Sequence, residues 1–112
     1  MPLSRSAEDV ASIIVRCQGA EFPSALRAAS PHFTTPDFEI SLARVLRSRP
    51  ELVDQWQRWS ADQRWTPSAF VQGAETGWYD GGYRGVTQHP DEAAAVADFI
   101  HRMADWQAAH SR

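Results

Sequence analysis

The chain has 112 residues and a formal net charge of −3, with 43% hydrophobic and 22% charged side chains. This composition excludes a disordered chain and fits one folded domain over residues 1–112. The acidic balance argues against a nucleic-acid-binding surface, which is usually basic, and no apolar run approaches the roughly 20 residues of a membrane-spanning helix. We therefore expect neither nucleic acid nor a membrane as a partner.

The basic residues and the single cysteine indicate where the protein works. All 11 residues counted as lysine or arginine are arginine, and asparagine is missing as well, which indicates a GC-rich, bacterial genome. Cys17 is the only cysteine, so an internal disulfide is excluded and a reducing compartment is favoured. Residues 1–6 lack the apolar stretch of a signal peptide. We expect a soluble, cytoplasmic protein.

A capping-box pattern opens the first predicted helix. Ser6 and Asp9 stand three residues apart, where a cap side chain and an acid can satisfy the first free backbone N–H groups of a helix. The pattern predicts a helix over residues 7–18, with Gly19 as its C-cap. Its apolar residues repeat at the i, i+3, i+4, i+7 spacing of one helix face: Val10, Ile13, Ile14 and Cys17.

Prolines divide the next part of the chain. Residues 20–35 are predicted to be a loop with one short helical turn over residues 24–29, because two prolines interrupt them. A threonine followed by Pro36 opens a helix, and Pro50 interrupts an apolar pattern that continues to residue 62. Whether residues 36–62 form one kinked helix or two helices stays open at this point.

The apolar period then changes from that of a helix to that of short strands. A long helix follows the strands from about residue 90 to residue 109, opened by a His-Pro-Asp-Glu sequence. The predicted fold is α+β, a two-layer domain in which a three-stranded antiparallel meander over about residues 68–87 packs against the N-terminal helices and the long C-terminal helix. The predicted strands cover residues 68–72, 76–79 and 83–87.

Aromatic side chains are concentrated in and around this meander. The chain has five tryptophans, five phenylalanines and two tyrosines, more ring surface than we expect its own interior to bury. Trp56 and Trp59 share a helix face and are assigned to the core, whereas strand alternation sends Trp78 and Tyr79 to opposite faces of the sheet. Aromatic residues and arginine are enriched at the centres of protein interfaces. The predicted binding residues are Trp65, Trp78, Tyr79, Asp80, Tyr83 and Arg84.

These features predict a non-enzymatic, soluble protein-binding domain that uses an aromatic and arginine face on the meander. Small inhibitor and immunity-type proteins share this general character, and the partner is either a different protein or a second copy of the chain. The alternative is a small-molecule-binding protein or small enzyme with a crevice between the sheet and the helices. Its polar groups would come from Glu75, Tyr79, Asp80 and His89.

No sequence motif points to a catalytic centre, a cofactor or a metal. The sequence contains no nucleophile elbow, no zinc-protease pattern and no pair of closely spaced cysteines. Asp98, His101 and Asp105 share one face of the last helix and are metal-ligand types. No second cluster in the sequence completes a site, so we expect a solvated, salt-bridged helix face. The predictions are no catalytic residue, no cofactor and no metal.

Overall fold

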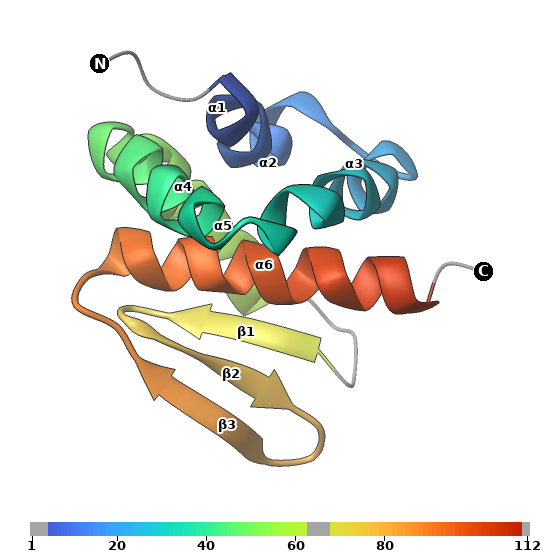
Figure 1. Cartoon of the computed structure of the whole chain (residues 1–112). Helices are drawn as coiled ribbons and strands as arrows, with labels where there is room; N and C mark the ends of the chain where they lie inside the picture. The colour runs from blue at the N-terminus through green and yellow to red at the C-terminus, as the bar shows by residue number, and fades with distance from the viewer. Residues whose placement is uncertain (1–4, 63–67, 111–112) are drawn as a thin grey trace.

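A computed structural model describes residues 5–62 and 68–110 and shows the predicted α+β fold with a three-stranded antiparallel meander (Figure 1). The elements in chain order are α1 (Arg5–Ala11), α2 (Ile13–Arg16), α3 (Glu21–Ala29), the 3-10 helix η1 (Ser30–Thr34), α4 (Pro36–Ser48), α5 (Pro50–Asp62), β1 (Ser68–Gln72), β2 (Glu75–Tyr79), β3 (Tyr83–Gln88) and α6 (Glu92–His110). Among the described helices, none combines the length and apolarity needed to cross a membrane.

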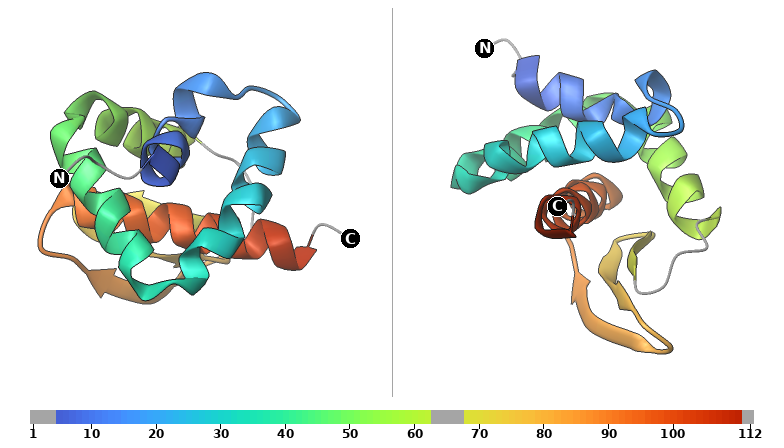
Figure 2. Two further views of the ribbon diagram at one scale, coloured as in Figure 1. Left: turned by 45° about the horizontal axis from the view of Figure 1, so that its top comes forward. Right: turned by 90° about the vertical axis from the view of Figure 1, so that its right-hand side faces the viewer.

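The long helix α6 runs through the middle of the fold. The sheet lies on one side of α6 and the helices α1 to α4 lie on the other, while α5 packs against both α6 and β1 (Figure 2). The predicted two-layer arrangement is therefore wrong, because α6 forms a separate layer between the sheet and the N-terminal helices. The reason is in the sequence of α6: a helix that is apolar on most of its sides has to be surrounded. Its buried residues are Ala93, Ala95, Val96, Ala97, Phe99, Ile100, Met103 and Ala104.

Ser12 breaks the first predicted helix into α1 and α2. Its hydroxyl donates to the carbonyl of Asp9 at 3.1 Å and accepts a hydrogen bond from Nε of Arg16 at 2.8 Å, so the side chain competes with the helix for backbone partners. The capping box at Ser6 is also wrong, because α1 already begins at Arg5 and Ser6 lies inside it.

The segment predicted as a loop is helical, forming α3 and η1. Pro23 occupies the third position of α3, in the first turn, where its missing N–H removes no hydrogen bond within the helix. Phe22, Leu26 and Ala29 are buried at helical spacing, so the sequence contained the pattern. Pro31 is near the start of η1, where proline is equally well tolerated.

The prolines Pro36 and Pro50 begin two separate helices. Thr35 precedes α4 with extended backbone angles and Pro36 is its first residue, as predicted. Arg49 has the non-helical angles φ −131° and ψ 68° and separates α4 from α5, which settles the question of one helix or two. Ser48 does not cap the start of α5, because its hydroxyl donates a hydrogen bond to the carbonyl of Val45 inside α4 at 2.7 Å.

The meander has the predicted strand order β1-β2-β3. A two-residue turn at positions 73–74 joins β1 to β2, and in the resulting register Ala69 lies opposite Trp78. The second turn joins β2 to β3, and Tyr79 lies opposite Tyr83. One extra residue on β3 makes a bulge at Gly85, whose φ of +60° is the left-handed conformation that glycine adopts most readily. Ala69 is buried, so its side of the sheet faces the helices.

Trp56 anchors the core, as predicted. Its side chain is fully buried, and its indole N–H donates to the carbonyl of Ala11 at 2.9 Å, which ties α5 to α1. Trp59 is half-buried and packs its ring 4.9 Å from the ring of Phe22. The N-terminal helices thus share one continuous apolar cluster with α6 and the inner side of the sheet.

Candidate functional site

The side of the sheet that faces away from the helices carries a chain of aromatic rings. The ring of Tyr83 makes edge-to-face contacts with Phe70 at 5.2 Å and with Tyr79 at 5.3 Å. Tyr83 is 68% exposed and Tyr79 is 40% exposed. Val86 is also exposed, and strand alternation places it on this side because Thr87 points inward to Arg102. We call Phe70, Tyr79, Tyr83 and Val86 the outer sheet face.

Gly77 leaves room for the ring of Phe70 on the outer sheet face. The two residues are opposite each other on β1 and β2. A Cβ atom at Gly77 would lie 2.8 Å from Cε1 of Phe70, which is too close for carbon atoms. The ring therefore occupies the space that a side chain on β2 would fill, and this positions it against Tyr83.

The structure brings some of the six predicted binding residues together and separates others. Tyr79 and Tyr83 are in contact on the outer sheet face, and Asp80 is exposed in the turn between them. Trp78 points to the inner side, and exposed Arg84 pairs with it across the strands. The prediction that Trp78 and Tyr79 face opposite sides is confirmed. Trp65 lies outside the described residues.

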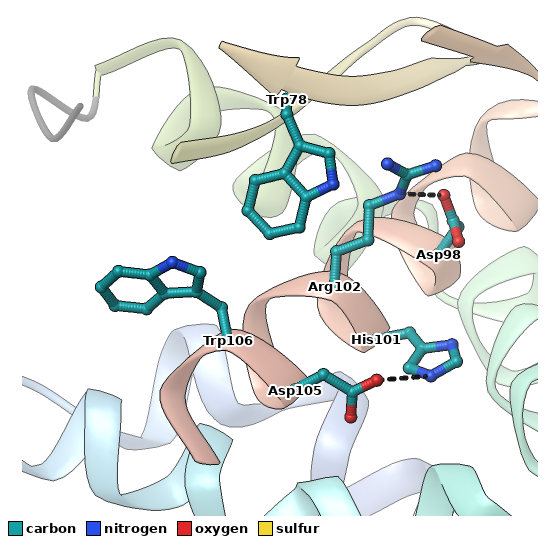
Figure 3. Close-up of a pocket in the computed structure, with 6 residues that line it drawn as sticks. All are labelled: Trp78, Asp98, His101, Arg102, Asp105 and Trp106. Atoms are coloured by element: carbon teal, nitrogen blue, oxygen red, sulfur yellow. Dashed lines mark hydrogen bonds and ion pairs between the residues drawn. The ribbon is translucent and has the colours of Figure 1, made fainter. Parts of the chain in front are cut away.

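A groove of about 460 Å³ lies between Trp78 on β2 and the C-terminal half of α6 (Figure 3). Trp78 projects from the strand toward α6, and Trp106 projects from α6 next to it. Trp106 is half-buried and stacks on His110 with ring centres 4.3 Å apart. The polar lining comes from one helix: Asp98, His101, Arg102 and Asp105.

The four polar residues that sequence reasoning proposed for such a crevice do not line this groove. Tyr79 lies on the outer sheet face, and Asp80 lies in the turn that follows it. Glu75 accepts a hydrogen bond from Gln88 on the neighbouring strand at 2.7 Å. His89 lies behind the sheet. A crevice between the sheet and a helix exists, but α6 supplies its polar groups.

A polar network lies behind β2, centred on the hydroxyl of the fully buried Thr76. This hydroxyl donates to Oδ2 of Asp98 at 2.6 Å and accepts from Nε2 of His89 at 2.8 Å. Oδ2 of Asp98 also accepts from Nε of Arg102 at 2.8 Å. Burial is the largest influence and would raise the pKa of Asp98, but the hydrogen bonds from Thr76 and Arg102 and the charge of Arg102 outweigh it and lower this pKa. Asp98 is therefore ionised at neutral pH.

The grouping of Thr76, His89 and Asp98 contains the residue types of a hydrolytic triad but not its geometry. In a triad the histidine accepts the hydroxyl proton and the acid holds the histidine. Here the hydroxyl proton is directed at Asp98, and His89 donates to Thr76. Thr76 is also completely buried, so no substrate can reach its oxygen. The network holds β2 against α6 rather than activating a nucleophile.

A second polar cluster surrounds His101 between α6 and α4. Its Nδ1 lies 2.6 Å from Oε1 of Glu39, and its Nε2 lies 3.1 Å from Oδ2 of Asp105. The ring stacks on Phe33 with centres 4.5 Å apart. One donor atom from each of Glu39, Asp98 and His101 lies within 4.8 Å of the others.

The expected salt bridges along this face of α6 form between Asp98 and Arg102 and between His101 and Asp105, but the expectation that the face is solvated is wrong for Asp98 and His101. Both side chains contact neighbouring elements, because α6 has the sheet on one side and α4 on the other. Sequence reasoning also missed Glu39, which is 62 residues from His101 along the chain. No local spacing links the two residues, and only the packing of α4 on α6 brings them together.

Two regions of the described surface thus carry side chains suited to binding. The outer sheet face offers exposed aromatic rings, and the groove beside Trp78 offers two indoles above a row of charged groups. Any function must be argued from the chemistry of these residues, because comparison with models of protein families, with curated proteins and with solved structures finds no match to this chain.

Proposed function

We propose that this chain is a protein-binding domain that contacts its partner through the outer sheet face. The observation that supports this proposal is the exposure of Tyr83 and Tyr79, at 68% and 40%, on a side of the sheet that no described helix covers (Figure 2). Tyrosine combines a large apolar ring with a polar tip and few rotatable bonds, which suits it to interface centres. The edge-to-face contacts of Tyr83 with Phe70 and with Tyr79 hold the two tyrosine rings in place before a partner binds.

The charge of the chain and the rings favours a basic partner surface. The chain carries a net charge of −3, and the exposed Asp80 adjoins Tyr79. The faces of tyrosine rings attract arginine and lysine side chains, and a nearby carboxylate strengthens this attraction. We expect a partner that packs an apolar or arginine side chain against the exposed rings of Tyr79 and Tyr83. A small acidic chain that blocks a basic protein fits the inhibitor or immunity-type class.

The strand β3 adds a second contact element beside the rings. It is an edge strand, and all of its residues are exposed. The backbone groups on its free edge can pair with an extended segment of a partner. The bulge at Gly85 interrupts regular pairing there, so we expect such pairing to be short and the ring contacts to supply most of the affinity.

Site-specific crosslinking followed by affinity measurement tests this proposal. A photo-reactive amino acid replaces Tyr83 in one sample and Ile40 in another, because Ile40 is 59% exposed on α4 and away from the sheet. The partner that is captured by crosslinking is then purified by itself. Its affinity is measured for the chain without the photo-reactive residue and for the alanine variants. We expect Y83A to weaken binding at least about 30-fold, corresponding to about 2 kcal/mol, and I40A to change it less than about twofold.

Two outcomes would contradict the proposal. Affinity that survives both Y79A and Y83A would remove the outer sheet face as the contact surface. Crosslinks from position 83 to the same chain alone, with a mass above 12.6 kDa in light scattering, would indicate self-association instead of a different partner.

The groove favours a second candidate function, the binding of a small molecule. Trp78 and Trp106 offer flat apolar walls, and Asp105 and Arg102 offer charges of both signs beside them. Such a mixture of aromatic walls and few polar groups is common in ligand sites. A fragment library screened by NMR should shift the two indole N–H signals together. If every compound that binds leaves these signals unchanged, the groove is not the ligand site.

A further inference from the structure

We propose that Glu39, Asp98 and His101 bind a divalent transition-metal ion where α4 meets α6, with Asp105 orienting the imidazole ring. One donor atom from each of the three ligands lies within 4.8 Å of the other two. The site is independent of the outer sheet face, which lies on the other side of the sheet. The three ligands are only partly exposed, whereas Asp105 is exposed, and two different helices supply the four residues.

Phe33 and Asp105 hold the ring of His101 from two directions. Phe33 stacks on it with an angle of 5° between the ring planes. Oδ2 of Asp105 lies 3.1 Å from Nε2, and the hydroxyl of Ser30 donates to the other oxygen of Asp105 at 3.0 Å. A carboxylate on one ring nitrogen, itself held by a further hydrogen bond, is the usual support for a histidine whose other nitrogen binds a metal. Here this leaves Nδ1 as the ligand atom.

The 2.6 Å distance between Nδ1 of His101 and Oε1 of Glu39 is that of a hydrogen bond, in which a proton lies between the two atoms. A metal ion can take the place of this proton if the ring hydrogen moves to Nε2, beside Asp105, because Nδ1 then presents a lone pair to the carboxylate oxygen. Two acceptors do not approach so closely unless a proton or a metal ion joins them. Adjacent ligands of a zinc ion are about 3.0–3.4 Å apart, so a small rotation of the Glu39 side chain replaces the proton by a metal.

Asp98 has an oxygen to spare for the same ion. Among the described residues, all of its hydrogen bonds and ion pairs fall on Oδ2, which faces Thr76, His89 and Arg102. Oδ1 has no such partner there, although the side chain is only 17% exposed. An ionised carboxylate with one free oxygen in a partly desolvated place is a strong acceptor for a cation.

The local charges also favour a dication. Three carboxylates, from Glu39, Asp98 and Asp105, surround His101, and Arg102 is the one guanidinium bonded to them within the described residues. A donor set of one imidazole nitrogen and two carboxylate oxygens suits zinc or manganese, whereas magnesium and calcium prefer oxygen alone. The groove beside Trp78 reaches Asp98 and His101, which gives an ion and its remaining water ligands a path from solvent.

Zinc titration of untagged, metal-free protein tests the proposal. Isothermal titration calorimetry should show one zinc ion bound per chain. We expect H101Q or E39Q to weaken binding at least about 100-fold and D105N to weaken it about 10-fold. The matched control H110Q, on the same helix, should leave the affinity unchanged.

A spectroscopic measurement on the wild-type protein checks the site without relying on variants that could unfold. In nitrogen-15 spectra of the imidazole rings, zinc should shift Nδ1 of His101 and leave its Nε2 bonded to hydrogen, while His32 and His110 stay unchanged. The absence of stoichiometric zinc binding would overturn the proposal. So would binding that survives both H101Q and E39Q, or a spectrum in which zinc occupies Nε2 or a different histidine.

Discussion

Replacing Thr76 with valine should destabilise the protein far more than the small change in shape suggests. The substitution keeps the size and the branched side chain but removes the buried hydroxyl. That hydroxyl donates to Asp98 at 2.6 Å and accepts from His89 at 2.8 Å. Its loss leaves a partly buried, ionised carboxylate with Arg102 as its main remaining partner.

The magnitude follows from these two hydrogen bonds. A hydrogen bond to a charged group contributes about 1.5–3 kcal/mol, and a neutral one contributes about 1 kcal/mol. His89 lies only 3.4 Å from Oδ2 of Asp98, so it can turn toward the carboxylate and recover part of the loss. We expect T76V to lower the free energy of unfolding by about 2–3 kcal/mol, equivalent to a decrease in Tm of roughly 10 °C for a domain of this size.

The dependence on pH separates this reasoning from a general packing defect. The pKa of Asp98 is lower in the folded protein than in an unfolded chain, so the ionised carboxylate stabilises the fold above its ordinary pKa of about 3.9. This stabilisation is lost as pH falls through the lower, folded pKa. T76V removes a hydrogen bond that lowers this pKa, so the stability difference from wild type should shrink as the solution becomes more acidic than about pH 4.

Urea unfolding followed by tryptophan fluorescence, near neutral pH and near pH 3, measures both quantities. The slope of free energy against urea should stay unchanged, since the surface exposed on unfolding is the same. T76S keeps the hydroxyl and should retain most of the stability near neutral pH. A T76V protein within about 0.5 kcal/mol of wild type, or a stability difference that stays constant into acid, would refute the reasoning.

Two further predictions concern backbone positions. Gly77→Ala should lower the free energy of unfolding by about 1–3 kcal/mol, because the new Cβ would lie 2.8 Å from the ring of Phe70. A Cβ at Gly82 meets nothing within 4 Å, so thermal unfolding should show a clear decrease in Tm for G77A and little change for G82A. Equal Tm values for the two variants would contradict this. Asp91→Ala should lower the free energy of unfolding by about 1–2 kcal/mol, because the carboxylate accepts a hydrogen bond from the backbone N–H of Ala94 at 2.8 Å at the start of α6. The loss should fade below about pH 4, because the pKa of Asp91 is lowered in the folded protein; a loss that persists in acid would point to another cause.

Local rules predicted the meander and several helix boundaries. Short strands joined by tight turns can only form antiparallel neighbours, and the two-residue alternation along β2 placed Trp78 and Tyr79 on opposite sides. Pro36 and Pro50 fix φ and lack an N–H, so both begin helices. The same rule applied to Pro23 gave the wrong answer, since a proline in the first turn of a helix is as acceptable as one in a loop.

The polar sites could not be predicted, because they depend on how many neighbours surround a helix. Periodicity shows that Asp98 and His101 lie away from the apolar residues of α6, and a helix on the surface would expose them. In this fold the remaining sides of α6 meet β2 and α4, which bring Thr76 and Glu39 to these residues. The contact between the tyrosines could be predicted from the sequence, because they lie on adjacent strands joined by a short turn. The cluster around His101 could not be predicted, because its residues lie far apart in the chain.

The central position of α6 has a consequence for how the protein is made. The N-terminal helices and the sheet meet each other chiefly where α5 contacts β1, and otherwise both pack on α6. The ribosome synthesises α6 after the other elements, so the side chain of Trp56, which contacts Phe99 on α6, cannot be fully buried until α6 has been made. Contacts such as that between Ser30 and Asp105 span 75 positions. The core therefore cannot close before α6 has been synthesised, and until then its exposed apolar side chains favour aggregation.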